Sequence, residues 1–192
     1  MIQLSWAVTL SHYTDSQDVV FGLTSNGRAA PLDEIAEVTG PTIATVPVRV
    51  SLGSDKTISA SLSEMQQQTI AMIPFLHHGL HRIRKLGADA AWACDFQTHL
   101  VIQPPDVTRL DLGNLAMQEE EDMKGYESFS SYALVVIFNM LSGSNGLDVW
   151  VNYDSNVLEE AEARRMLEQF GAVLRQVHDR PQFEIRDIDI II

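Results

Sequence analysis

The chain has 192 residues, of which 45% are hydrophobic and 20% are charged, and its formal net charge is −13. This length is enough for one domain with its own core, or for one lobe of a larger unit. A surface this acidic repels phosphate backbones and anionic membranes, so neither is expected as a partner. Cys94 is the only cysteine and no stretch is apolar enough to span a membrane, which together predict a cytoplasmic protein.

The first quarter of the chain predicts a helix, two strands and a short helix between them. Residues 2–10 are apolar-rich and suit a helix, and no capping residue precedes them, so we expect a cut inside a longer protein. Residues 19–24 predict a short buried strand, and 31–38 a short helix with proline and acids in its first turn. Residues 42–50 alternate and are β-branched, which predicts a strand. Pro47 favours its placement at a sheet edge or a bulge.

The rest of the chain alternates between helical and strand patterns. The predicted elements are helices at 57–72 and 76–86, strands at 96–103, 133–138 and 147–153, and a strongly amphipathic helix at 158–177. The inward positions of the first of these helices are Ile58, Leu62, Met65, Ile70 and Ile73. A turn-rich link predicts a hairpin of the last two strands, and residues 183–190 suit an edge strand or a linker. The fold class is α+β, with helices packed on a mixed, largely antiparallel sheet.

A histidine cluster is the first candidate for chemistry. His77 and His81 are four residues apart on an expected helix, a spacing that can hold a metal. The glutamate expected as a general base between such histidines is missing, and the segment carries Arg82, Arg84 and Lys85, which disfavour a cation. A helix with surface histidines is therefore the favoured interpretation, and a small metalloenzyme remains a third alternative.

Other catalytic patterns are absent from the sequence. There is no Gly-x-Ser-x-Gly elbow, no Gly-x-x-x-x-Gly-Lys loop and no Gly-x-Gly-x-x-Gly after a strand. Cys94 precedes an apolar strand and has Asp95 beside it, a setting that raises a thiol pKa, so we expect a packed, inert cysteine. Residues 105–124 are polar and acidic and predict a mobile loop. The residues alone thus offer no self-contained catalytic set.

The order of segments resembles a known family. Ser5-Trp6-Ala7, residues 18–22 and Gly27-Arg28 are similar to the fourth core motif region of condensation domains of non-ribosomal peptide synthetases. The segments that are similar to later motifs are residues 38–50, residues 74–80, residues 93–104 in the form associated with fungal synthetases, and residues 153–155 with the final helix. The resemblance covers nearly the whole chain in family order.

The resemblance implies a chloramphenicol-acetyltransferase-like fold in which two lobes form a V around the active site. The family signature, His-His-x-x-x-Asp-Gly on the N-terminal lobe, governs attack of the acceptor amine on the donor thioester. Here His77-His78 is followed by Arg82-Ile83 where the signature needs Asp-Gly. The resemblance therefore implies that residues 1–192 are a single domain: the C-terminal lobe, truncated on its N-terminal side and inactive alone.

The same resemblance implies roles for individual residues. Arg28 aligns with the Arg that bridges the lobes by pairing with the signature Asp. Gly40, Pro41 and Thr42 fall where a strand end meets the tunnel for the phosphopantetheine arms. Ala44 takes a position where the family usually has Asn, so a side-chain hydrogen bond to substrate is lost there. The acidic residues 111–122 fall near segments that cross between the lobes.

The expected reaction and partners follow from the family. A whole condensation domain forms amide, or cyclising ester or amide, bonds between carrier-bound aminoacyl or peptidyl thioesters. This chain would supply tunnel wall and docking surface to an N-terminal lobe and to carrier domains, whose 4′-phosphopantetheine is not a cofactor bound by the chain itself. Docking of an acidic carrier would use the basic spots at Arg82-Ile83-Arg84-Lys85 or Arg164-Arg165. A non-catalytic scaffold lobe is the alternative.

Overall fold

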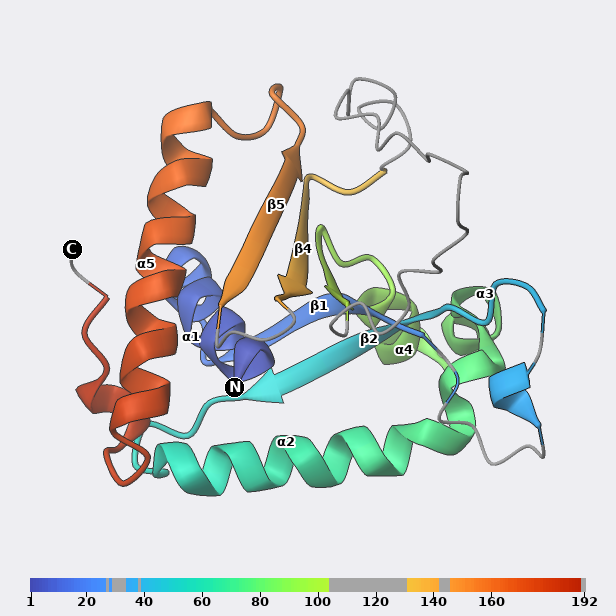
Figure 1. Ribbon diagram of the computed structural model, residues 1–192, viewed down its shortest axis with the longest axis horizontal. Helices are drawn as coiled ribbons and strands as arrows, with labels where there is room; N and C mark the ends of the chain where they lie inside the picture. Colours follow the sequence, from blue (N-terminus) through green and yellow to red (C-terminus); the bar gives the residue numbers. More distant parts are fainter. Residues whose placement is uncertain (27, 29–33, 38, 104–130, 142–145, 191–192) are drawn as a thin grey trace, which may run out of the picture.

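The computed structural model describes residues 1–26, 28, 34–37, 39–103, 131–141 and 146–190 (Figure 1). The described residues form one five-stranded sheet with helices against it. In chain order the elements, with η for 3-10 helices, are α1 (Ile2–Thr14), β1 (Asp18–Ser25), η1 (Ile35–Glu37), β2 (Ala44–Ser51), α2 (Ile58–Met72), η2 (Ile73–His78), α3 (Leu80–Ile83), η3 (Arg84–Leu86), α4 (Ala88–Ala93), β3 (Thr98–Gln103), β4 (Leu134–Met140), β5 (Leu147–Tyr153), α5 (Glu160–Asp179) and η5 (Ile185–Asp187).

The sheet has the strand order β2-β1-β3-β4-β5 and is mixed. β1 pairs with β2, and β4 with β5, in antiparallel fashion, whereas β1–β3 and β3–β4 are parallel. The expected hairpin of the last two strands and the edge position of the strand with Pro47 are both confirmed. The sheet is mixed, as expected, because β3 lies between β1 and β4 and is parallel to both.

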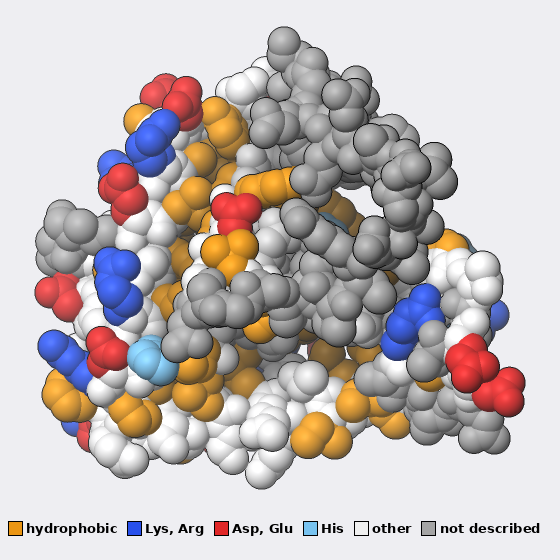
Figure 2. Space-filling view, viewed as in Figure 1, with side chains coloured by type: hydrophobic (Ala, Val, Ile, Leu, Met, Phe, Trp, Pro, Cys, Tyr) orange, Lys and Arg blue, Asp and Glu red, His pale blue; other side chains and the backbone are white. Residues whose placement is uncertain are grey.

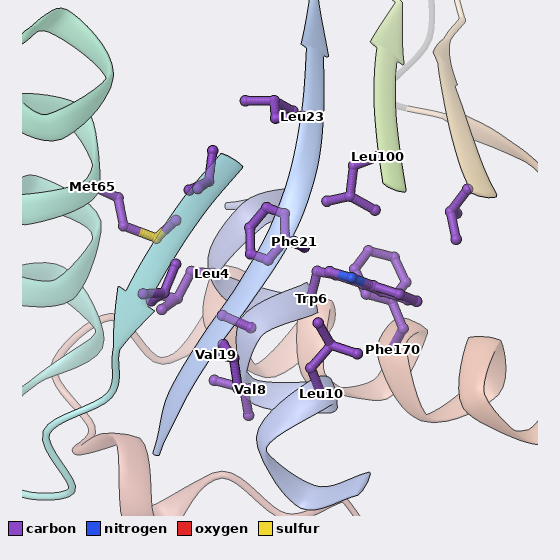
Figure 3. Close-up of a cluster of buried hydrophobic side chains, with 14 of the residues drawn as sticks. Leu4, Trp6, Val8, Leu10, Val19, Phe21, Leu23, Met65, Leu100 and Phe170 are labelled. Atoms are coloured by element: carbon purple, nitrogen blue, oxygen red, sulfur yellow. The ribbon is translucent and has the colours of Figure 1, made fainter. Parts of the chain in front are cut away.

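One face of the sheet carries the main core (Figure 3). Alternate residues of β1, such as Phe21 and Leu23, point to this face and meet α1, α2 and α5. All residues of α1 from Leu4 to Leu10 are buried, which is typical of a helix enclosed on every side. Trp6 packs edge-to-face on Phe170 of α5 with 5.8 Å between ring centroids. The helix layer thus leaves the opposite sheet face for other contacts.

The final helix, α5, begins with a capping box. The Glu159 side chain accepts from the backbone of Glu162, and the Glu162 carboxylate accepts from the Glu159 backbone N–H. Met166, Phe170, Val173 and Val177 face the core, while charged side chains run along the outer side of the helix (Figure 2). The amphipathic helix expected at 158–177 is confirmed, with bounds shifted by two residues at each end.

The segment after α2 differs most from expectation. The single helix expected at 76–86 is wrong, because the chain forms η2, α3 and η3 instead. Gly79 has φ 81° and interrupts the helical path at the point where an L-residue would be strained. Ile70, expected to point inward, is 58% exposed. Of the helix expected at 31–38, the described part is a 3-10 turn at Ile35–Glu37.

The C-terminal tail clasps α2 rather than adding a full edge strand. A single bridge pairs Thr57 with Glu184. The backbone N–H of Ile58 donates to Phe183 O (2.9 Å), and that of Ile185 donates to Lys56 O (2.9 Å). Gln176 of α5 holds the tail further along, donating to Asp189 O (2.6 Å) and accepting from the Asp189 N–H (3.0 Å).

Two further expectations concern the acidic loop and a membrane-spanning segment. The acidic segment 105–124 lies among residues that the structure does not describe. Among the described residues, no helix has the length and apolar character that crossing a membrane requires.

Candidate functional site

A chain of polar side chains lies on the sheet face opposite the main helices. Thr45 of β2, Thr24 of β1 and His99 of β3 come from three adjacent strands. The hydroxyl oxygens of Thr45 and Thr24 are 2.7 Å apart, and Thr24 Oγ1 is 2.7 Å from His99 Nε2. We call Thr45–Thr24–His99 the hydroxyl–imidazole chain. It links three adjacent strands of the sheet through their side chains.

Aromatic rings close one side of this network. The ring of Phe96 packs directly on Gly22, where an added Cβ would lie 2.2 Å from Phe96 Cε2. Phe96 stacks on Tyr132 with 5.0 Å between centroids, and the Tyr132 ring is 4.9 Å from the His99 ring. Gly22 and His99 are register partners, so the missing side chain of the glycine makes room for this aromatic layer.

Burial sets the electrostatics of this site. Desolvation lowers the pKa of His99 below its usual range, which favours the neutral imidazole near pH 7. Burial likewise raises the pKa of Tyr132, with a smaller contribution from Cys94, so the phenol stays protonated. The network is therefore a set of neutral hydrogen-bonding groups, suited to bind polar uncharged parts of a ligand.

The connection between β1 and β2 brings Arg28 and Thr42 close to the same residue. The Arg28 backbone N–H donates to Asn26 Oδ1 (3.1 Å), and the Thr42 hydroxyl donates to Asn26 O (2.7 Å). The Arg28 side chain, half-buried, donates from Nη1 to Ile35 O (3.0 Å). Two of the residues singled out by resemblance, Arg28 and Thr42, are thus joined through Asn26.

The other singled-out residues divide between two environments. Gly40 and Pro41 are exposed, and Gly40 has φ 135°, a conformation that favours glycine. A Cβ on Gly40 would meet nothing within 4 Å, so this part of the chain borders open space. Ala44 is buried in the core cluster, so its side chain points to the helix layer while that of Thr45 points the other way. The structure therefore does not place Ala44 with Thr24 and His99, and its proposed tunnel role stays a prediction.

Sequence reasoning missed the hydroxyl–imidazole chain. Thr24, Thr45 and His99 are far apart in sequence, and only the strand register brings them together. A signal was present: each alternates with a buried apolar neighbour, Leu23, Val46 and Leu100. This alternation places all three on the face opposite the core, but it does not say which strands are neighbours.

The other candidate groups have structural surroundings. Cys94 is buried, and desolvation raises the pKa of its thiol; Arg84 lowers that pKa and Asp95 raises it by smaller amounts. The inert cysteine expected from the sequence therefore fits. His77 lies in η2 and His81 in α3, on either side of Gly79, so the expected i, i+4 pair on one helix is wrong. Within the described residues, no group of three or more His, Cys, Asp or Glu side chains could hold a metal.

In each of the two basic spots one arginine forms an ion pair. Arg84 pairs with Asp95 and also donates to Cys94 O, while Arg164 pairs with Glu160. No ion pair of Arg82 or Lys85 occurs among the described residues, and both side chains are exposed. Apolar side chains are exposed in the same segment, including Trp92 at 84%. Both spots therefore have exposed cations outside the described ion pairs, Arg82 and Lys85 in the first and Arg165 in the second.

Comparisons with known proteins agree on one family. The family model described as Condensation domain matches residues 1–192. Nonribosomal peptide synthetase 13 of Aspergillus fumigatus is 35% identical over 99% of this chain, and the synthetase notE′ of Aspergillus versicolor is 40% identical over 98%. This chain spans only 9% and 8% of the length of those two relatives.

Solved structures show the same fold. A crystal structure described as CT has a TM-score of 0.76 and 24% identity, covering 98% of this chain and 42% of its own. The first condensation domain of the CDA synthetase has a TM-score of 0.73 and 16% identity, covering 100% of this chain and 41% of its own. The fold is thus the chloramphenicol-acetyltransferase-like fold that the sequence predicted, and this chain spans less than half of each structure.

Proposed function

Because the chain belongs to the condensation-domain family of nonribosomal peptide synthetases, we propose that it is the C-terminal lobe of such a domain. In this proposal it supplies tunnel wall and docking surface for amide-bond formation between carrier-bound thioesters, while the partner lobe supplies the catalytic histidine. The observation that carries the proposal is a family match over all 192 residues in a sequence without His-His-x-x-x-Asp-Gly.

In the tunnel role, the phosphopantetheine arm lies along the segment that leads into β2, residues 40–45. The arm is a narrow chain with two amides, and it arrives on a partner carrier domain. Open space around Gly40 and the hydroxyls of Thr42 and Thr45 fit such a chain, because amides need hydrogen-bond donors and acceptors along a shallow wall. The chemistry of the thioester belongs to the arm, and this chain binds and orients it.

The bridging role assigns Arg28 to the junction with the partner lobe. A guanidinium can pair with a carboxylate through two parallel hydrogen bonds, which fits the expected contact with the signature Asp. The bonds of the Arg28 segment to Asn26 and Ile35 fix its backbone and one side-chain nitrogen, which orients the group beforehand. Arg28→Lys keeps the charge but loses the bidentate geometry.

The decisive experiment separates the lobes. This chain alone should form no peptide bond between two carrier-bound aminoacyl groups, and addition of the matching N-terminal lobe should restore the reaction. In the complete two-lobed domain, Arg28→Gln should slow condensation at least tenfold, with Arg28→Lys intermediate. The matched control Arg49→Gln removes an exposed arginine that pairs with Asp18 and should leave the rate within twofold. Condensation by the isolated chain would overturn the proposal.

The exposed apolar and basic segment favours a second candidate, a docking lobe without a tunnel role. Binding to carrier domains with and without the pantetheine arm distinguishes the two. Binding that needs the arm supports the tunnel, whereas equal binding of both carriers supports a scaffold that uses Arg82, Lys85 and Trp92.

A further inference from the structure

In the hydroxyl–imidazole chain, the protonation of His99 determines which way the two threonine hydroxyls donate their hydrogen bonds. Thr24 has one hydroxyl proton and two neighbours, Thr45 Oγ1 and His99 Nε2, each at 2.7 Å. When Nε2 carries no proton, the Thr24 proton must point to it, and the Thr45 proton must then point to Thr24. When Nε2 carries a proton, it donates to Thr24. The Thr24 hydroxyl can then donate to Thr45, and the Thr45 proton can point to another acceptor.

We propose that His99 is a positioning residue that sets the hydrogen-bonding polarity of Thr45 through Thr24. Our proposal assigns the proton of the neutral ring to Nδ1, which leaves Nε2 unprotonated, and Thr45 then offers only lone pairs to the sheet face. With Nε2 protonated, Thr45 also offers a donor. The ligand class is an amide-bearing chain, since an amide contains both kinds of partner. The ligand part of this inference rests on the proposed tunnel role.

The change in hydrogen-bond direction is close to the β1–β2 connection, which carries Arg28 and Thr42. Thr45 is three residues after Thr42, whose hydroxyl fixes Asn26, and Thr24 is two residues before Asn26. The same two strands therefore carry both the relay and the β1–β2 connection with Arg28. A change in the direction of these hydrogen bonds is felt first by the backbone amides at the start of β2.

The surroundings of His99 make this chain the main route by which its charge acts. Tyr132 is the titratable group packed on the ring, and it stays neutral because burial raises its pKa. The charged groups of the flanking strands, Asp18 of β1 and Arg49 of β2, pair with each other, and β3 and β4 carry no other titratable side chain. In the segment before β3, Asp95 pairs with Arg84 and Cys94 is buried with a raised thiol pKa.

The test uses the 192-residue chain without ligand. Long-range proton–nitrogen NMR correlations of the imidazole give the protonation of Nε2, and backbone amide shifts of Ala44 and Thr45 are followed from pH 8 to pH 5. We expect those amides to titrate together with the ring. In Thr24→Val the ring should still titrate, but the amide response should fall at least threefold, and Thr24→Ser should restore it.

The control is His12→Gln, which removes an exposed histidine at the end of α1 and should leave the amide response unchanged. Two outcomes would overturn the inference: a proton already on Nε2 at pH 8, or an equal amide response in wild type and Thr24→Val. Either result can be read without any ligand.

Free pantetheine then tests the ligand class. Its dissociation constant should change at least threefold between pH 8 and pH 5 in wild type and should be flat in Thr24→Val and Thr45→Val. Absence of binding at either pH, with the amide coupling intact, would refute the proposed tunnel role and the ligand class but not the positioning role of His99. Binding with the same pH dependence in all three chains would refute the polarity effect itself.

Discussion

Gly22 shows how a single residue shapes the candidate site. The ring of Phe96 takes the space that a Cβ at Gly22 would need, and Phe96 is buried, so the ring has little freedom to move aside. Glycine is required here by close approach and not by its backbone angles. The aromatic layer over His99 depends on that approach.

Gly22→Ala should therefore destabilise the chain by about 1–3 kcal/mol, the usual cost of overpacking. Gly171→Ala is the matched control, because its Cβ would meet only a flexible arginine at 3.7 Å on α5. Alanine there should stabilise the folded chain by about 0.5–1 kcal/mol, because alanine has less backbone entropy than glycine in the unfolded chain and loses less on forming the helix. Urea denaturation gives both values, and a neutral Gly22→Ala would mean that Phe96 can move.

His99 should make stability depend on pH. Because its folded pKa is lowered by burial, the unfolded chain takes up a proton below about pH 6.5 while folded His99 stays neutral. Proton uptake by the unfolded state means that the free energy of unfolding falls as the pH falls from 7 toward 5. His99→Gln should have a flatter profile in that window, as measured by urea denaturation at several pH values.

His178→Gln is the control for this profile, because it removes an exposed histidine on α5. Carboxylates contribute to the pH dependence of every variant, so the difference between profiles is the quantity that matters. A His99→Gln profile that is parallel to wild type from pH 7 to pH 5 would contradict the assignment of a half-buried, neutral imidazole.

Among the elements, those with a strong pattern were predictable and those defined by one backbone angle were not. The helix at Glu160–Asp179 has clear apolar periodicity, and that of Ile58–Met72 is weaker. The segment 76–86 has enough helical pattern to suggest a continuous helix, but the φ of Gly79 breaks it. Ile70 is exposed because it lies to one side of the face of α2 that is turned to the core. That face carries Ile58, Met65 and Met72.

The C-terminal tail should contribute more to stability than its irregular structure suggests. Ile185 and Ile188 are buried, so Ile188→Ala should cost about 2–5 kcal/mol, the range for deletion of a buried side chain of this size. Ile43→Ala, at a 68% exposed position just before β2, should change stability by less than about 0.5 kcal/mol. Thermal or urea unfolding followed by circular dichroism measures both. Equal effects would mean that the tail is not part of the cooperative unit.

At the scale of the whole molecule, strand order was beyond the reach of the sequence. Pro47 placed β2 at an edge correctly, and the turn-rich link predicted the β4–β5 hairpin. The parallel neighbours β1–β3 and β3–β4 result from tertiary packing on the helix layer, which no local pattern encodes. For this reason the motifs indicated Arg28 and Thr42, while the contact of Thr24 with His99 needed the structure.

The net charge of −13 leads to a prediction about docking rates. Association with a carrier domain of negative net charge should speed up when salt rises from about 0.01 M to 0.15 M, because the Debye length shrinks from about 30 Å to 8 Å and screens the overall repulsion. Stopped-flow fluorescence with the isolated chain measures this rate. A rate that falls steeply over this range would mean that local cations dominate the encounter.

The double variant Arg82→Glu with Lys85→Glu should slow this association at both salt concentrations, most at low salt. The matched control Arg186→Glu changes a cation of the C-terminal tail and should have a smaller effect once its change in net charge is allowed for. Equal effects of the two changes would argue against docking at residues 82–85.

The clasp between the tail and α2 has a mechanical consequence. Tension applied at Asp189 is met first by the paired bonds to Gln176 and then by the bonds of Phe183 and Ile185 to the start of α2. These bonds share the load before any of it reaches the sheet. A pull from that side would therefore be spread over α2 and α5, while the strands bearing Thr24, Thr45 and His99 stay in register.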